Sequence, residues 1–590
     1  MSLGRSVAHA AACAALLVAG SIFLAATAAA AERPPAAVLA PQDTLVFVSI
    51  ADVPTLKARF AETSFGRMAQ DPAIRPLILS LYDIGVGAFA QNVASRVGLS
   101  LNELLAIPGG EIALAIVPVE GRLPAFIFFL DAGKNAALLD KLIAGVEDTF
   151  EANGRLRQEE TLDDMKIVTY DARGGLSMVR KDASLVVSSD ISVLKDVMAR
   201  WTIEPIDNLA DNRNFGAVMS RCPNPMDDPP QIFAYADPMA LLRQMSGTSG
   251  ELSVFMAFGP LLGLDGILAA GATYHMAIDE YDSVMQLDLL LDAPREGAVE
   301  LFALTSGDNT PEAWVPPNAA DYTTLHWDVH FTYEKLAALV DGIQGEGAFA
   351  RLVTSQLLNN VGVDLEEELL PLVAGRASFA SVIEPPYRPG SDAKVFGVQV
   401  TDPDAADALL ARVAAQHVDF VEAKRYGDIE YFITRQREGI DPDSPRGRTR
   451  LCAAVVGDYL LMADRESALL EAFAARAETE GALAAATDYL LVADKVDQLY
   501  QAPPSMFSFG RPEESLRIPY EMAISPDNRA QLREQAANNE LLKKVVDALD
   551  AHPLPPFDVL RQYLAPGGAA LTNDASGLHY MTFSLRPPSE

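Results

Sequence analysis

The stretch Val97-Gly-Leu-Ser-Leu-Asn-Glu-Leu-Leu105 resembles Val361-Gly-Val-Asp-Leu-Glu-Glu-Glu-Leu369, far away in the same chain of 590 residues. Four further pairs of similar segments follow in the same order, at offsets of roughly 270 residues: 164–170 with 428–434, 181–187 with 457–462, 209–215 with 483–489, and 232–235 with 506–509. One such pair could arise by chance, whereas five pairs in one order indicate an internal repeat. The sequence therefore predicts two tandem copies of one module.

The repeat divides the chain into three parts. Residues 1–31 are set apart by their composition, residues 32–305 form the predicted first copy, and residues 306–590 form the second. The boundary is placed where 306–318, rich in Ser, Gly, Asn and Pro, is typical of a linker. Each copy is larger than an average domain, so each can bury its own core.

Within a copy, the spacing of apolar residues predicts both strands and helices. Strands are expected at 45–50, 111–117, 125–130, 165–170, 176–180 and 184–188, and helices at 53–60, 74–82, 135–150 and 191–201. Asp190 and Asp464 are placed to cap matching helices in the two copies. Each copy is expected to close with a strand pair, at 269–278 and 283–291 or at 569–572 and 578–585. The predicted class is α+β, with largely antiparallel sheets and helices packed on one face.

Residues 1–31 have the order of an export signal. Arg5 precedes an apolar stretch from Ala14 to Ala26, and a run of small residues ends at Ala31. That order predicts a signal peptide cleaved near Ala31 and a periplasmic or extracellular protein with no transmembrane helix after cleavage. An uncleaved anchor is the alternative, because about 20 apolar residues suffice to span a bilayer. Cleavage would leave Cys222 and Cys452, too few for a disulfide framework.

The charge of the chain excludes some partners. Asp and Glu number 80 against 46 Lys and Arg, which gives a formal net charge of -34, while 49% of residues are hydrophobic. The apolar fraction is too high for a disordered acidic chain. The negative charge argues against nucleic acid, whose binding needs clustered cations, and against docking on anionic lipid.

Three segments resemble a known family. They are Ala40-Pro-Gln-Asp-Thr-Leu-Val-Phe-Val48, Phe126-Ile-Phe-Phe-Leu-Asp131 leading into Leu138-Leu139, and Leu185-Val-Val-Ser-Ser-Asp190 followed by Asn208-Leu-Ala-Asp-Asn-Arg-Asn-Phe215. Together they resemble the uncharacterised secreted bacterial proteins grouped as the domain of unknown function numbered 3352. The resemblance implies export and a repeated α+β fold, and it transfers no catalytic residue.

One constellation has the residue types of a metal site. In His326-Trp-Asp-Val-His330, a strand would place His326, Asp328 and His330 on one face, and imidazole and carboxylate groups ligate zinc and similar ions. Alternate strand residues are roughly 7 Å apart, which is wide for a shared ion, so an amphipathic strand with a solvated face is the competing interpretation.

Common catalytic motifs are missing from the sequence. It has no G-x-x-x-x-G-K-[ST], G-x-S-x-G, H-E-x-x-H or C-x-x-C. Acid clusters such as Glu159-Glu160 are better interpreted as solvated surface, although paired carboxylates for hydrolysis need be neighbours only in space. No cofactor is predicted.

These observations favour an exported, non-enzymatic scaffold or binding protein of the bacterial cell envelope, with an unidentified envelope protein or ligand as partner. An envelope hydrolase using a metal or paired carboxylates is one alternative. A periplasmic lipid or lipoprotein carrier is another. An enclosed apolar cavity between sheet and helices would favour the carrier, whereas a packed core would not.

Overall fold

The computed structural model describes residues 33–587, apart from 95–96, 163–164, 172–174, 203–205, 223–227, most of 247–261, most of 437–448 and 478–481. The predicted signal segment, residues 1–31, lies outside the described residues.

The described residues of the first half contribute ten strands. They are β1 (Val46–Ile50), β2 (Ile112–Val117), β3 (Ala125–Asp131), β4 (Arg157–Leu162), β5 (Met165–Tyr170), β6 (Leu176–Lys181), β7 (Ser184–Ser188), β8 (Ile232–Ala236), β9 (Ile267–Ile278) and β10 (Tyr281–Leu291). They pair in the order β4-β5-β6-β7-β3-β2-β1-β8-β9-β10, and every pair is antiparallel. The main helices are α2 (Ala36–Leu39), α3 (Val53–Glu62), α4 (Ser64–Gln70), α5 (Arg75–Phe89), α7 (Leu101–Ala106), α8 (Ala136–Ala152), α9 (Ile191–Thr202), α10 (Arg213–Arg221) and α11 (Pro238–Ser246).

The second half, in the part of it that the structure describes, contributes ten more strands in the corresponding order. They are β11 (Asp321–His326), β12 (Val373–Ile383), β13 (Asp392–Val400), β14 (Val421–Tyr426), β15 (Ile429–Thr434), β16 (Cys452–Val456), β17 (Tyr459–Ala463), β18 (Met506–Gly510), β19 (Gly567–Asp574) and β20 (Gly577–Leu585). They pair as β14-β15-β16-β17-β13-β12-β11-β18-β19-β20. The main helices are α13 (Val329–Gln344), α14 (Ser355–Val361), α15 (Pro403–Gln416), α17 (Glu466–Ala477), α18 (Thr487–Leu499), α19 (Pro512–Ile524), α20 (Pro526–Ala536), α21 (Glu540–Ala551) and α22 (Phe557–Arg561).

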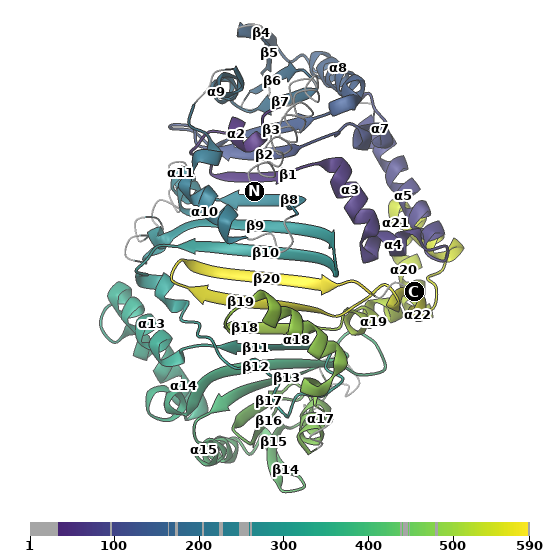
Figure 1. Ribbon diagram of the computed structural model, residues 1–590. Coiled ribbons are helices and arrows are strands. Elements are labelled where there is room, and N and C mark those ends of the chain that lie inside the picture. The colour runs from purple at the N-terminus through teal and green to yellow at the C-terminus, as the bar shows by residue number, and fades with distance from the viewer. Residues whose placement is uncertain are drawn as a thin grey trace, which may run out of the picture.

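The two sets of strands join into one sheet of 20 strands (Figure 1). The joint is the antiparallel pair of β10 and β20, in which Leu287 lies opposite Tyr580. The last strand of each half therefore lies at the centre, and β4 and β14 lie at the two ends of the strand order. The α+β class and the antiparallel pairing are confirmed. That the halves are copies of one module stays a prediction.

Helices cover both faces of the sheet toward its outer ends. On β3, Ile127 and Phe129 point to one face and belong to a buried cluster that includes Leu194 of α9. The adjacent Leu130 points to the other face and packs in a cluster with Leu139 of α8. The expectation of helices on a single face thus misses the second layer, because β3 is buried on both sides.

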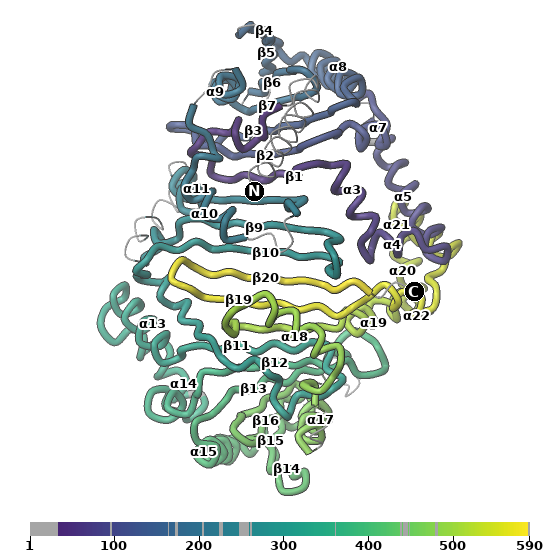
Figure 2. Tube along the Cα trace, viewed as in Figure 1, coloured from purple at the N-terminus to yellow at the C-terminus, as the bar shows by residue number. Residues whose placement is uncertain are grey.

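A second contact between the halves lies away from the sheet. Ile74, just before α5, is buried in one apolar cluster with Tyr520 of α19 and with Phe557 and Leu560 of α22. Figure 2 shows the early helices α4 and α5 lying beside the late helices α20 and α21. The halves therefore meet through this helical contact as well as through β10 and β20.

In each half, an ion pair ties the segment that precedes the first strand, β1 or β11, to the sheet. In the first half Arg33 pairs with Glu111, which precedes β2. In the second half Glu312 pairs with Arg376 of β12 at 3.1 Å. Ile112 and Ala377 occupy matching positions in the two halves, and Glu111 and Arg376 directly precede them. The acid thus lies next to the second strand in the first half, whereas in the second half the base lies there and the acid lies on the preceding segment.

The predicted linker, 306–318, is packed against the second half. It has no helix or strand, as expected, yet Glu312, Trp314 and Val315 within it are buried. Trp314 lies against Gly397 of β13, where an added Cβ would come within 2.6 Å of the indole. The segment is therefore part of the second core.

Three local expectations have different outcomes. The Asp190 side chain accepts the Ser192 N–H at 2.8 Å and begins α9, which confirms that cap. Asp464 does not cap α17, because its carboxylate accepts the Lys394 N–H of a neighbouring strand at 2.8 Å. Cys222 and Cys452 are free and buried, and burial raises the pKa of each thiol to about 12.

Candidate functional site

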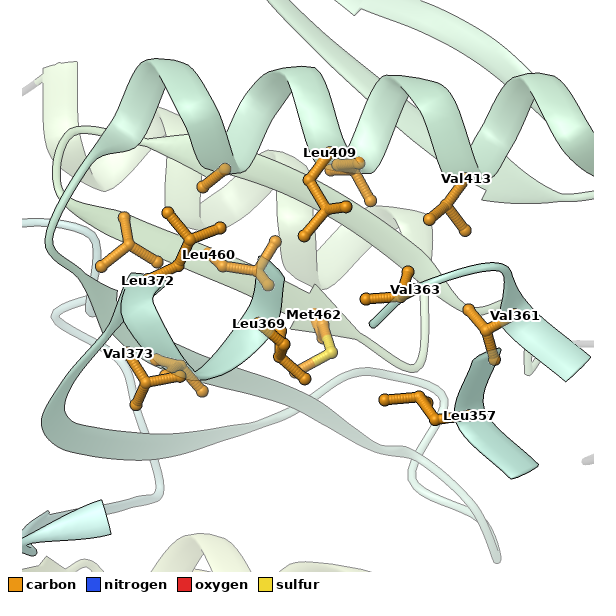
Figure 3. Close-up of a pocket in the computed structure, with 14 residues that line it drawn as sticks. Leu357, Val361, Val363, Leu369, Leu372, Val373, Leu409, Val413, Leu460 and Met462 are labelled. Atoms are coloured by element: carbon orange, nitrogen blue, oxygen red, sulfur yellow. The ribbon is translucent and has the colours of Figure 1, made fainter. Parts of the chain in front are cut away.

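An apolar cavity lies between the sheet and the helices of the second half. Its roof is α15, which begins at Pro403 behind Asp402, whose side chain accepts the Ala405 N–H at 3.0 Å. A proline in the first turn suits a helix, because its nitrogen is not needed there as a donor. Leu409 and Val413, four residues apart, extend from the same side of this helix into the cavity (Figure 3).

The side wall is formed by α14 and by a π-helical turn, η7 (Leu365–Leu369), which is followed by a short 3-10 helix, η8 (Leu370–Leu372). Gly362 ends α14 with φ 75°, a left-handed backbone conformation that favours glycine. Asp364 begins η7 by accepting the Glu366 and Glu367 N–H groups, each at 2.9 Å.

The cavity has a volume of about 350 Å³ and is lined only by apolar side chains. The floor comes from β12, β13 and β17. The lining residues are Leu357, Val361, Val363, Leu369, Leu372, Val373, Val398, Val400, Ala406, Leu409, Leu410, Val413, Leu460 and Met462. Such walls offer water no hydrogen-bond partner, so the space favours a hydrocarbon occupant.

An ion pair links the wall of the cavity to its roof. Arg412 of α15 donates two hydrogen bonds to the Glu368 carboxylate of η7, at 2.5 and 2.8 Å. These bonds, and the Asp364 N–H, lower the pKa of Glu368 to about 2. Arg412 and Glu368 directly precede two cavity-lining residues, Val413 and Leu369, so this exposed pair joins roof and wall next to the cavity.

The matching part of the first half is filled. Leu130 and Leu185, which take the register positions of Val398 and Leu460, are 6% and 7% exposed. Tyr170 is fully buried there and packs on Phe150, with ring centroids 4.9 Å apart. Thr434 stands at the end of β15 where Tyr170 stands at the end of β5. Val398 and Thr434 are smaller than Leu130 and Tyr170, the residues at the matching positions, which agrees with the open space in the second half.

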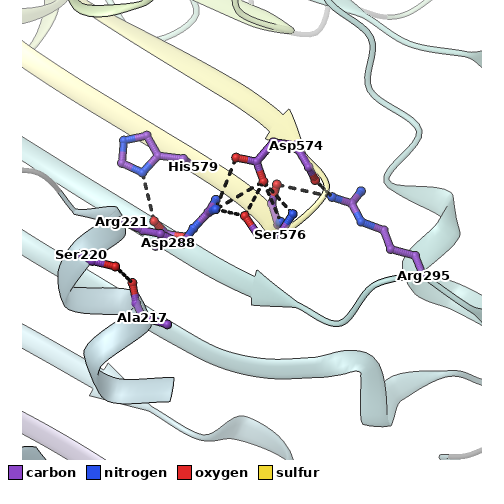
Figure 4. Close-up of polar contacts among 9 residues, drawn as sticks. Ala217, Ser220, Arg221, Asp288, Arg295, Asp574, Ser576 and His579 are labelled. Carbon is purple, nitrogen blue, oxygen red and sulfur yellow. Dashed lines mark hydrogen bonds and ion pairs between the residues drawn. The ribbon is translucent and has the colours of Figure 1, made fainter. Parts of the chain in front are cut away.

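A second pocket, of about 460 Å³, lies at the joint of the two halves and is lined mainly by polar residues. Arg221 of α10 contacts Asp288 of β10 at 2.7 Å, and Asp288 contacts His579 of β20 at 3.2 Å (Figure 4). Arg221 also reaches Asp574 at 3.3 Å. Burial raises the pKa of Asp574, but hydrogen bonds from Ser576 and the Arg221 charge outweigh it and leave the pKa lowered.

The ion pairs at this joint are reciprocal. Arg221 of α10 in the first half reaches Asp574, at the turn between β19 and β20. Lys495 of α18 in the second half reaches Glu280, at the turn between β9 and β10, at 2.9 Å. Each half thus sends a cation to the closing hairpin of the other half, so we interpret this pocket as part of the joint.

The predicted metal-ligating residues do not share a strand face. β11 ends at His326, Asp328 caps α13 by accepting the Phe331 N–H at 3.0 Å, and His330 lies within α13. His326 Nε2 lies 2.9 Å from the Asp308 carbonyl oxygen, and burial lowers the pKa of its imidazole. The expected strand across 326–330 is therefore wrong. No group of three His, Cys, Asp or Glu among the described residues is arranged to hold a metal ion.

Comparison with known proteins adds no relative. No family model matches the chain, and neither the curated proteins nor the solved structures contain a match. The resemblance to the domain of unknown function numbered 3352 therefore stays a prediction. Within the part of the chain that the structure describes, no helix has the length and apolar character needed to cross a bilayer.

Proposed function

We propose that this chain is an exported, non-enzymatic binding protein whose second half encloses the hydrocarbon chain of an amphipathic ligand. The observation that carries the proposal is the cavity under α15, with its entirely apolar lining. This is the feature that favours a carrier over a scaffold with a packed core.

The volume of the cavity limits the size of its occupant. An apolar cavity of roughly 150 Å³ holds benzene, which has six heavy atoms, so about 350 Å³ holds by proportion roughly 14. That size corresponds to a medium-chain fatty acid such as dodecanoic acid. The volume also lies within the range of about 300 to 1,000 Å³ that is usual for ligand sites.

The chemistry of the lining supports binding without turnover. General acid–base or nucleophilic catalysis requires a titratable or nucleophilic group in contact with the substrate. The lining side chains are Leu, Val, Ala and Met, which offer none. An export route is supported by residues 1–31 alone, whose order of charge, apolar core and small residues is that of a signal peptide.

Calorimetric titration of the purified chain with dodecanoic acid tests this function. Val413→Phe places a ring in the cavity and is expected to weaken binding at least tenfold while the protein stays folded. Ala408→Phe, on the exposed side of the same helix, is the matched control and should bind as the parent does. Absence of binding by the parent, or equal binding by the Val413 variant, would overturn the proposal.

A further inference from the structure

The cavity lies at one end of a row of apolar residues that crosses the sheet. Val398 of β13 and Leu460 of β17 lie opposite each other, and both line the cavity. Directly opposed residues of antiparallel strands point to the same face. From Val398 the row continues across the second half through Ala377, Leu325, Met506, Leu571 and Tyr580.

The row continues without a break into the first half. Tyr580 of β20 lies opposite Leu287 of β10 across the joint. Beyond Leu287, each successive strand again contributes one apolar residue: Ala272, Ala234, Val48, Leu114 and Phe128. The row thus spans every strand from β17 to β3 in the order of Figure 1, twelve steps of about 4.8 Å each or roughly 58 Å in all.

A second row runs beside it, two residues further along each strand. In the first half it contains Ile112, Ile50, Ile232, Tyr274 and Met285. In the second half it ends at Phe379, Phe396 and Met462, the last of which lines the cavity. Near the joint it contains Thr323 and Ser508, whose hydroxyls bond each other at 2.8 Å. Neither row contains a charged residue, and we call the two rows together the apolar track.

Large side chains of the apolar track are exposed. Val48, Leu114 and Leu287 are 37%, 40% and 39% exposed, and Phe396 and Met462 are 40% and 39% exposed. By contrast Phe47, which neighbours Val48 on the same strand, points to the other face and is 2% exposed. Several large apolar side chains exposed on one face of a sheet are a feature of sites that bind another molecule.

We infer that the apolar track holds additional hydrocarbon chain of the ligand, so the ligand is a lipid with more than one acyl chain. This inference rests on the proposed function of the cavity, because Val398, Leu460 and Met462 belong to both surfaces. One leaflet of a bilayer has a hydrocarbon thickness of about 15 Å, so a track of roughly 58 Å accommodates more than the chain that fills the cavity.

The apolar track suits hydrocarbon better than a protein partner. It offers no charge for an ion pair, and each of its strands between β3 and β17 is already paired on both sides. An added strand from another protein therefore has no free edge to join. The acidic chain also favours a zwitterionic headgroup over an anionic one.

The test uses two ligands on the full chain. One is dodecanoic acid, which fits the cavity, and the other is a phosphatidylcholine with one fluorescent parinaroyl chain. Leu287→Asp places a charge at the middle of the apolar track and is expected to weaken phosphatidylcholine binding about ten- to a hundredfold, the range that corresponds to losing the burial of one leucine. Dodecanoic acid binding should be unchanged, because Leu287 does not line the cavity.

Leu123→Asp is the matched control, since Leu123 is 64% exposed and lies outside every strand of the track. It should bind both ligands as the parent does. If Leu287→Asp binds phosphatidylcholine as tightly as the control, or if the parent binds only dodecanoic acid, the track is refuted and the cavity stands. If the parent binds neither ligand, the proposed function itself fails.

Discussion

The buried pair of Glu312 and Arg376 provides the sharpest test of how the second half is held together. Replacing Glu312 with Gln is expected to lower the free energy of unfolding by about 3–5 kcal/mol, the usual cost of leaving one partner of a buried ion pair uncompensated. The side chains of Glu312 and Arg376 are 6% and 11% exposed, so solvent cannot replace the lost charge.

The surrounding hydrogen bonds add to this cost. Glu312 accepts from the Tyr322 hydroxyl at 3.0 Å and from the Ser378 hydroxyl. Gln keeps the shape and one accepting oxygen, so these bonds are weakened and not all are lost. With an m value of about 3 kcal/mol per molar urea, a loss of 3 kcal/mol lowers the unfolding midpoint by about 1 M.

The assay is urea unfolding followed by tryptophan fluorescence, in a Trp201→Phe, Trp327→Phe background that leaves Trp314 as the reporter. Trp314 is 2% exposed and lies two residues from Glu312, so it reports on this core. The control is Glu300→Gln, which removes a half-exposed pair with Lys335 and should cost less than about 1 kcal/mol.

The first half suggests a rescue, since its Arg33 and Glu111 carry the charges in the opposite order. The double exchange Glu312→Arg, Arg376→Glu should therefore be more stable than either single change. A Glu312→Gln variant within about 1 kcal/mol of the parent, or an exchange no better than the single variants, would refute the reasoning.

Three further predictions follow from burial and close packing. Burial raises the pKa of Tyr235 and Tyr281 to about 12, so the folded state holds these two protons more tightly than the unfolded state does. Their contribution to stability is therefore complete below pH about 10 and is lost as the pH rises beyond it. Absorbance at 295 nm should show both tyrosines ionising only as the chain unfolds. Gly397→Ala should lower the free energy of unfolding by about 1–3 kcal/mol and shift the fluorescence of Trp314, because the new methyl group meets the indole at 2.6 Å. The control Gly342→Ala, which has open space around it in α13, should be neutral or stabilising. Equal melting temperatures of the two variants would contradict this prediction. Asp288→Asn removes a fully buried charge that contacts Arg221 and His579, and it should lower the free energy of unfolding by about 3 kcal/mol. The loss is measured as faster hydrogen exchange of β10 and β20. The control Glu280→Gln, at the half-exposed counterpart, should exchange as the parent does.

Elements with a strong apolar pattern could be predicted from the sequence. The strands expected at 165–170, 176–180 and 184–188 are β5, β6 and β7 within one residue, because each combines apolar side chains with a nearby turn. The closing pair expected at 269–278 and 283–291 is β9 and β10. In these elements the local pattern and the tertiary packing favour the same structure.

Elements without such a pattern escape prediction. β4 carries Glu159 and Glu160, which are indicative of solvated surface, yet its backbone pairs with β5. As an end strand with five exposed side chains it has no apolar period to reveal it.

The helix that replaces the expected strand at 326–330 did have a signal in the sequence. Tyr333, Leu336 and Val340 recur at helical spacing, and Asp328 precedes them as a capping residue. The alternation of His326, Asp328 and His330 favoured a strand because it was considered over five residues alone. A longer stretch of sequence, extended toward the end of α13, shows the helical spacing and so distinguishes a helix from a strand.

The cavity could not be predicted, because it results from differences in side-chain size between several elements. In sequence, the cavity roof α15 is as apolar as the matching helix α8. Leu409, Leu410 and Val413 of α15 correspond to a similar run in α8, Leu138, Leu139 and Leu142. What differs lies on distant strands, such as Thr434 in place of Tyr170. Only their arrangement in space shows which half is filled.

The central position of β20 has a consequence for synthesis of the chain. β10 is complete once Leu291 has been made, but its partner begins only at Gly577, roughly 290 residues later. At 5–20 residues per second, a ribosome needs about 15–60 s to close that interval. Until β20 is available, a folded first half exposes an unpaired edge at β10, and two incomplete chains can pair there. The time that passes before β20 pairs with β10, and whatever covers that edge in the meantime, therefore affect how much of the protein avoids that misassembly.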